Sequence, residues 1–146
     1  MQLQHILVPL DFSADAEHAL EYAINLARTV GARLTLFHVM QPFPLAGVPM
    51  GVPLPATYLQ ASEAALQQAM ETALGRVTAS GVAGESRMVY GVPWQEVLEA
   101  AERQAVDLII MGTRGRTGLA HVLLGSVAEK VVRLAPCAVL VVPHRA

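Results

Sequence analysis

A glycine- and arginine-rich segment in the last third of the sequence has the residue types that bind phosphate. It runs from Gly112 to Gly118, contains Arg114 and Arg116, and is followed by Gly125-Ser126 at the start of an expected helix. Glycines let the backbone approach an anion, and a helix N-terminus adds free N–H groups and the positive end of its dipole. The serine hydroxyl and the guanidinium groups can add hydrogen bonds. Together these features favour an anion site over a tight turn of solvated residues.

A carboxylate at the end of the first apolar run supplies a second group for the same site. Asp11 follows the run His5–Pro9, as Gly112 follows a later apolar run. In an open parallel sheet, ligands bind beyond the carboxyl ends of the strands, at the point where the strand order reverses. If the two strands are neighbours, both ends meet at one crevice. Asp11 can then accept a hydrogen bond from an adenine amino group or a ribose hydroxyl, so the sequence favours a nucleotide site.

Several familiar catalytic and metal-binding motifs are absent. The only lysine, Lys130, follows Glu129, so there is no G-x-x-x-x-G-K-[ST], and the glycine segment reads G-x-x-G-x-x-G rather than G-x-G-x-x-G. No serine lies in G-x-S-x-G, and the five histidines form no i,i+4 pair. The single cysteine, Cys137, excludes an internal disulfide and a multi-cysteine metal site. We expect neither a P-loop NTPase, a dinucleotide dehydrogenase, a serine hydrolase nor a metal centre.

The elements that must position these residues follow from the hydrophobic periodicity. Apolar runs alternate with segments in which apolar residues recur at helical spacing. We expect strands at 5–9, 34–39, 86–90, 106–111 and 138–142, and helices after Ser13, around 59–77, after Pro93 and at 126–134. With right-handed crossovers, this alternation predicts an α/β fold with an open, twisted, parallel five-stranded sheet and helices on both faces. If the fourth strand returns beside the first, the strand order is 3-2-1-4-5. Residues 1–146 are interpreted as one domain.

Composition excludes further classes of protein. Hydrophobic residues make up 53% of the chain and charged residues 15%, which is not the composition of a disordered chain. The net charge of −2 argues against a broadly basic nucleic-acid binder. The uncharged stretch 34–62 contains five prolines and cannot be one membrane-spanning helix. No basic segment precedes the first apolar run, so we expect no signal peptide and a soluble, cytoplasmic protein. The proline-rich segment 41–55 is either a lid or a plain loop.

The same residues resemble a known family, the universal stress proteins, in its ATP-binding branch. The spacing Gly112, two residues, Gly115, nine residues, Gly125-Ser126 matches that branch's G-2x-G-9x-G-[S/T] pattern. The opening Ile6–Pro9 with Asp11, and the C-terminal segment 135–142, are similar to the family as well. The resemblance covers nearly the whole chain. The sequence departs from the family at Ala138, in the last strand, where many relatives carry proline.

The resemblance implies the Rossmann-like fold of adenine nucleotide alpha hydrolases, with ATP across the first and fourth strands. Adenine would lie against Pro9, Asp11 and the backbone of Val39, and the ribose beside Met111 and Gly112. The phosphates would lie among Gly115, Arg116, Gly125, Ser126 and Val127. A Mg²⁺ ion would bridge the phosphates rather than occupy a protein cage, as Mg²⁺ usually does.

The resemblance also implies a homodimer through the last strand, Ala138–Val142, whose apolar edge would otherwise be uncovered. The expected function is nucleotide-responsive regulation in a stress response, through a protein partner that the sequence does not name. A slow Mg²⁺-dependent ATPase is an alternative, but no lysine or general base is recognisably placed, so we expect at most weak ATP hydrolysis. A nucleotide-free interaction module is a further alternative, against which the intact glycine pattern stands. No nucleic acid and no membrane are expected as partners.

Overall fold

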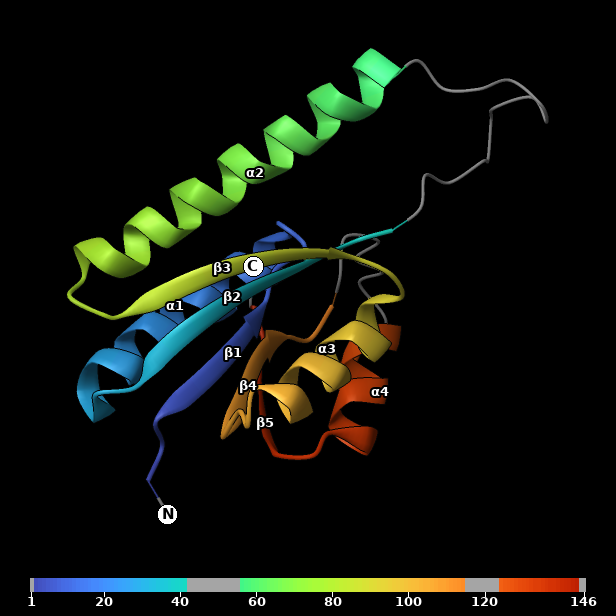
Figure 1. Cartoon of the computed structure of the whole chain (residues 1–146). Coiled ribbons are helices and arrows are strands. Elements are labelled where there is room, and N and C mark those ends of the chain that lie inside the picture. Colours follow the sequence, from blue (N-terminus) through green and yellow to red (C-terminus); the bar gives the residue numbers. More distant parts are fainter. Residues whose placement is uncertain (1, 42–55, 115–123, 145–146) are drawn as a thin grey trace.

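The computed structural model describes residues 2–41, 56–114 and 124–144, with only the backbone described for 56–61. Strands and helices alternate along the chain (Figure 1). They are β1 (His5–Pro9), α1 (Ala14–Val30), β2 (Arg33–Met40), α2 (Ala56–Ala79), β3 (Gly84–Tyr90), α3 (Pro93–Arg103), β4 (Leu108–Gly112), α4 (Ser126–Leu134) and β5 (Ala138–Val142). The strands form one parallel sheet in the order β3-β2-β1-β4-β5, which confirms the predicted order 3-2-1-4-5.

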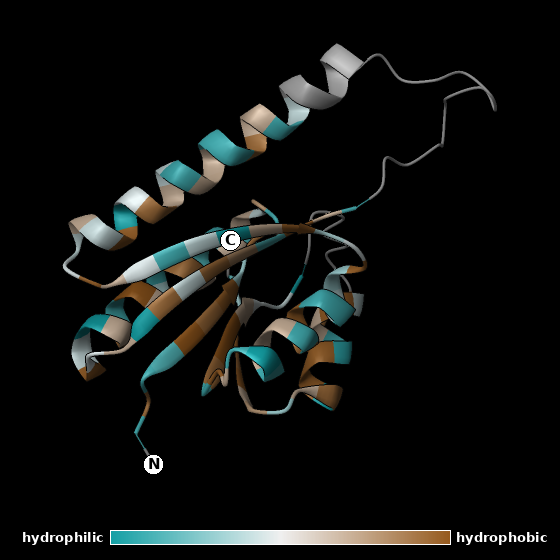
Figure 2. Ribbon diagram, in the orientation of Figure 1, coloured by the Kyte–Doolittle hydropathy of each residue, from teal (hydrophilic) through white to brown (hydrophobic). Residues whose placement is uncertain are grey.

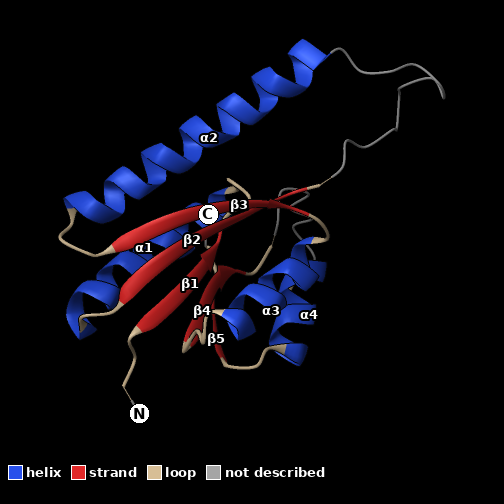
Figure 3. Cartoon of the chain, in the orientation of Figure 1, coloured by secondary structure: helices blue, strands red, loops and turns tan. Residues whose placement is uncertain are grey.

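Helices cover both faces of this sheet, as predicted (Figure 3). α1 and α2 pack on one face, while α3 and α4 pack on the other. Successive residues of the central strand β1 point to opposite faces. Thus Ile6 and Val8 belong to the core under α1 and α2, and Leu7 belongs to the core under α3 and α4. Figure 2 shows this central strand as hydrophobic, in contrast to the mixed surfaces of the helices.

The limits of α1 have local causes that the sequence displays. Ser13 precedes the helix, and its hydroxyl oxygen accepts a hydrogen bond from the backbone N–H of Ala16 at 3.2 Å. Gly31 ends the helix in the left-handed conformation with φ of 77°, which a glycine adopts without a steric penalty. Both ends of α1 agree with the prediction. Because α1 begins at Ala14 and β1 ends at Pro9, only a short turn joins them.

The predicted strand 106–111 begins later than expected. Val106 is buried, but its backbone N–H donates to the Ala101 carbonyl oxygen at 2.9 Å, because the chain is still leaving α3 there. Ala105 has a φ of 50°, and β4 begins only at Leu108. The predicted strand therefore began two residues too early, because Val106 is apolar and buried but lies before the first residue of β4. Among the residues described, no helix has the length and hydrophobicity needed to span a membrane.

A buried polar group lies at the opposite end of the sheet from the predicted crevice. His5 receives a hydrogen bond on Nδ1 from the Arg33 guanidinium at 3.0 Å, and its Nε2 lies 2.8 Å from the Thr35 hydroxyl oxygen. Because an arginine only donates, Nδ1 accepts and the neutral ring carries its proton on Nε2. Thr35 in turn donates to Glu85 at 3.2 Å. Burial, helped by the Arg33 charge, holds the pKa of His5 below its usual 6.5, against opposing contributions from Glu85 and Asp107.

We predict that this histidine makes folding less favourable in mild acid. Below pH 6.5 the unfolded chain binds a proton that the folded His5 resists, so the free energy of unfolding falls as pH falls. One such group contributes a slope of at most about 1.4 kcal/mol per pH unit. Urea unfolding between pH 7.5 and 5.5 measures this slope, and it should be shallower in His5→Gln. An equal slope in both proteins would show that His5 is not responsible.

Candidate functional site

The predicted crevice lies where the strand order reverses. From β1 the chain continues to β2 and β3 on one side of the sheet, whereas β4 and β5 lie on the other side. β1 and β4 are parallel neighbours, with Ile6 paired to Leu108. Their carboxyl ends therefore meet at one edge of the sheet, with Asp11 just beyond β1 and Gly112 at the end of β4. This is the point at which open α/β sheets bind ligands.

A rigid turn presents Asp11 at this edge. Its Oδ1 atom accepts a hydrogen bond from the backbone N–H of Ser13 at 2.9 Å. Phe12 has a φ of 63°, and its ring lies against the buried ring of His38, with centroids 5.1 Å apart. His38 Nδ1 donates to the carbonyl oxygen of Leu10 at 2.6 Å, which ties the turn to β2. Within the described residues, the second carboxylate oxygen of Asp11 has no hydrogen bond, so it is the acceptor that the turn leaves open.

Gly112 is required by packing before any ligand is considered. A Cβ atom at this position would lie 2.8 Å from both the backbone carbon and the Cβ of Asp15. The first turn of α1 therefore rests directly on the end of β4. The sequence predicted a role for this glycine beside a ribose, but it did not predict the close approach of α1.

The carboxylate of Asp15 holds the first residues after β4. It is 6% exposed and accepts hydrogen bonds from the Thr113 hydroxyl at 2.9 Å and from the backbone N–H of Arg114 at 3.1 Å. The Arg114 Nε atom lies 3.3 Å away and forms an ion pair with it. Burial alone would raise the pKa of Asp15, but the hydrogen bonds from Arg114 and Thr113 and the Arg114 charge outweigh it. The pKa therefore lies below the usual 3.8.

Arg114 is thus not directed at a phosphate in this structure. The sequence offered Arg114 or Arg116 as phosphate ligands, but the Arg114 side chain is 26% exposed and paired with Asp15. Arg116 and Gly115, the other predicted ligands of this segment, lie outside the described residues. Asp15 itself was not among the residues predicted to form this site. Nothing in its sequence context shows that β4 and Arg114 lie beside it.

The two ends of the glycine segment are joined by a backbone hydrogen bond. The N–H of Gly125 donates to the carbonyl oxygen of Thr113 at 2.6 Å. Gly125 is the N-cap of α4, and no side chain caps this helix. Within the described part of the chain, no side chain accepts a hydrogen bond from the first N–H groups of α4, at Ser126 and Val127. Ser126 begins the helix as predicted, at a point directly beside the end of β4.

The remaining predicted residues lie on the strands beside the crevice or nearby. Pro9 ends β1 and pairs with Phe37, and Met111 lies in β4 beside Val141. Val39 lies in β2, and its side chain packs in the core under α3 and α4. The ammonium of Lys130, the only lysine of the chain, lies 4.9 Å from the centre of the Trp94 ring, where it makes a cation–π interaction.

The chain after β5 reaches the same carboxylate. His144 Nδ1 lies 3.7 Å from Asp15 Oδ1, and the His144 and His18 rings are 5.3 Å apart. The fold thus brings together two histidines that are far apart in the sequence. Within ranges 2–41, 56–114 and 124–144, no group of three or more histidine, cysteine or acidic residues is arranged to hold a metal ion. Asp15 therefore links the glycine segment to the C-terminal end of the sheet.

We predict that the charge of Asp15 stabilises the fold and that acid removes this contribution. Asp15→Asn keeps an acceptor but loses the ion pair, which should lower the free energy of unfolding by about 1–3 kcal/mol at pH 7. The folded pKa is lower than the unfolded one, so the difference should disappear as pH falls below 3.8. Urea unfolding at pH 7 and at pH 3 measures both effects.

Glu17→Gln is the matched control, because Glu17 lies in the same first helical turn and also forms an ion pair, with Arg76, but its side chain is 41% exposed. It should lower the stability much less than Asp15→Asn does, since solvent screens exposed ion pairs. An equal loss in the two variants would mean that the burial of Asp15 adds nothing to its contribution.

Comparison with known proteins finds relatives that match nearly the whole chain. The sequence model of the universal stress protein family matches residues 2–143. Universal stress protein MJ0531 of Methanocaldococcus jannaschii is 38% identical over 141 residues, covering 94% of this chain and 80% of that protein.

Solved structures show the same fold. The structure of MJ0577, a universal stress protein from the same organism, has a TM-score of 0.84 and 30% identity, covering 100% of this chain and 99% of the other. A universal stress protein in complex with cAMP has a TM-score of 0.74 and 26% identity, with 98% of each chain covered. The chain belongs to the universal stress protein family.

Proposed function

We propose that the crevice between β1 and β4 binds ATP and that the protein acts as a nucleotide-responsive regulator. The observation that carries this proposal is the pairing of two complementary features at one edge. Asp11 offers an open carboxylate oxygen on one side. On the other side, the N-terminus of α4 has no side-chain cap and adjoins a segment closed by the Thr113–Gly125 hydrogen bond. ATP is complementary to both features. Its adenine amino group can donate a hydrogen bond to Asp11, and its phosphates carry the negative charge that a helix N-terminus favours.

The proposed placement of the nucleotide follows this polarity. The adenine amino group donates to Asp11, and the base lies against Pro9 and the backbone of Val39. Met111 and Gly112 border the ribose. The phosphates are received by Gly115, Arg116, Gly125, Ser126 and Val127. The complex of a related universal stress protein with cAMP supports an adenine nucleotide as the ligand class. Mg²⁺ is held through the phosphates, since it usually keeps several waters and few protein ligands.

The charged groups near the crevice support binding more than turnover. Phosphoryl transfer depends on cations positioned on the reacting phosphate and on a group that orients the nucleophile. Among the described residues, Arg114 is paired with Asp15, and Lys130 lies over Trp94. We therefore propose at most slow hydrolysis. Regulation by occupancy requires only that the nucleotide changes the surface around the glycine segment, which a partner protein then recognises.

The C-terminal strand is the proposed site of homodimer formation. Within the described residues, β5 pairs with β4 alone, so the other edge of β5 is open. An open apolar edge is a template for pairing with a second chain. Because Asp15 contacts both the residue after β4 and His144 after β5, a change in the glycine segment has a direct route to this edge.

The nucleotide proposal predicts that ATP is bound and that Asp11 selects its base. Denaturation of purified protein should release an adenine nucleotide, and calorimetry should detect ATP binding with and without Mg²⁺. Asp11→Asn keeps the oxygen that accepts from Ser13 but replaces the open acceptor with a donor. It should weaken ATP binding about tenfold and reduce the preference for ATP over GTP, with little change in melting temperature.

Ser13→Ala is the control, because it removes the side chain that caps α1 and leaves the open carboxylate oxygen of Asp11 in place. It should lower the melting temperature and leave the preference for ATP unchanged. No released nucleotide and no heat at millimolar ATP would contradict the proposal. Rapid, sustained phosphate release would identify an ATPase instead.

The dimer proposal predicts twice the chain mass of 15.6 kDa in solution. Sedimentation equilibrium at tens of micromolar protein measures this mass directly. Leu140→Lys should shift the equilibrium toward monomer, because Leu140 lies in β5 and is only partly buried. A monomer of the unaltered chain at this concentration would contradict the proposal.

A further inference from the structure

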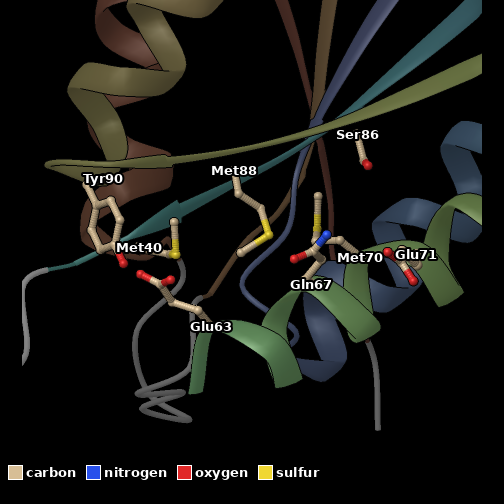
Figure 4. A pocket seen from close by; sticks show the side chains of 8 residues that line it. All are labelled: Met40, Glu63, Gln67, Met70, Glu71, Ser86, Met88 and Tyr90. Atoms are coloured by element: carbon tan, nitrogen blue, oxygen red, sulfur yellow. The ribbon is translucent and has the colours of Figure 1, made fainter. Parts of the chain in front are cut away.

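We propose that the groove between α2 and β3 binds a linear aliphatic polyamine. The groove has a volume of about 360 Å³, within the usual range for small-molecule sites. It lies on the α2 face of β2 and β3, whereas the nucleotide crevice lies at the ends of β1 and β4 (Figures 1 and 4). Met40, on the α2 side of β2, lines the groove, while its neighbour Val39 packs on the opposite face. This proposal therefore does not depend on nucleotide binding.

One wall of the groove comes from alternate residues of β3. Ser86, Met88 and Tyr90 line it, and their spacing of two residues places them on the same face, about 6.6 Å apart along the strand. Met40 pairs with Tyr90 in the neighbouring strand and extends this wall. The wall thus offers a hydroxyl at one end, thioethers in the middle and a phenol ring at the other end.

The opposite wall is a row of acceptors on α2. Glu63, Gln67 and Glu71 follow one another at four-residue intervals, about 6 Å apart along the helix axis. In Figure 4 they occur in the same order as the strand residues, with Glu63 toward Tyr90 and Glu71 toward Ser86. The outer carboxylates are therefore about 12 Å apart along the axis, with an amide oxygen between them.

The negative charge of the groove favours a cationic ligand. Within the described residues, neither Glu63 nor Glu71 has an ion-pair partner. Two nearby arginines are paired elsewhere. Arg76 contacts the acidic residues of α1, and Arg87 contacts Glu85 on β3. The two carboxylates are exposed to solvent and give the groove a negative charge that no described cation offsets.

The methionines show which kind of cation fits. Met40, Met70 and Met88 line the groove between the two rows of polar groups, and thioethers adapt to the shape of an apolar ligand. Methylene groups are stabilised when they leave water and are buried against such a surface. A compact hydrated metal ion gains nothing from such a surface. A chain of methylenes with ammonium groups at its ends satisfies both the carboxylates and the methionines.

The match extends to individual groups of the ligand. One terminal ammonium lies between Glu63 and the ring of Tyr90, which is 58% exposed and free to make a cation–π interaction. The other terminal ammonium lies between Glu71 and the Ser86 hydroxyl. A nitrogen between them donates to the side-chain oxygen of Gln67. The spacing of the three acceptors therefore selects a triamine over a short diamine.

Calorimetry with spermidine tests the proposal on nucleotide-free protein, because polyamines also bind ATP phosphates. We expect spermidine to bind with a dissociation constant below about 1 mM at low ionic strength, and added salt to weaken it. Putrescine reaches only two adjacent acceptors and should bind about tenfold more weakly. An equal concentration of Mg²⁺ should not displace spermidine. No spermidine binding, or equal affinity for all three cations, would overturn the proposal.

Charge-neutral variants locate the site. Glu63→Gln and Glu71→Gln should each weaken spermidine binding about three- to tenfold, the range expected for single partly exposed charge contacts. Glu102→Gln makes the same charge change on the exposed surface of α3 and should leave binding unchanged. Met88→Ala should weaken spermidine more than it weakens putrescine, because fewer methylenes contact this residue in the shorter ligand. Equal losses in Glu102→Gln and Glu63→Gln would show that only overall charge matters.

Discussion

The contact between Asp15 and the end of β4 is the constraint on which this edge of the structure depends. The first turn of α1 lies so close to Gly112 that any side chain there would collide with Asp15. Its buried carboxylate then needs partners, because an unpaired buried charge is unfavourable. Thr113 and Arg114 supply them, and in doing so they fix the direction in which the chain leaves β4. The path of the chain directly after β4, at Thr113 and Arg114, follows from this packing requirement.

The same sheet offers two regions with opposite electrostatic character. At the ends of β1 and β4, uncapped N–H groups of α4 favour an anion. On the α2 face of β3, Glu63 and Glu71 favour a cation. Alternation of side chains along the strands keeps these regions separate, since Val39 faces one layer and Met40 faces the other. The two proposed ligands, of opposite charge, would therefore share no residue of the protein.

Much of the fold follows from local features of the sequence. The alternation of apolar runs and helical patterns predicts every strand and helix, and Ser13 and Gly31 mark the limits of α1. The strand order needs the tertiary structure, because right-handed connections are compatible with several orders and only the pairing of β4 with β1 selects this one. The predicted limits of a strand are wrong where a buried apolar residue does not make the hydrogen bonds of a strand. Val106 is buried like a strand residue, yet its N–H bonds to α3, and no periodicity reveals that difference.

The sequence by itself determined the α/β fold, the family resemblance and the candidate residues at the ends of two strands, because these depend on spacing along the chain. Only the tertiary structure decided which charges remain available. Arg114 looked like a phosphate ligand until the fold placed the buried Asp15 beside it. Glu63 and Glu71 are exposed on α2, and only the fold places Met40 and Met88 opposite them. The reason is physical: the role of a charged group depends on the neighbours that compensate it, and those neighbours come from distant parts of the chain.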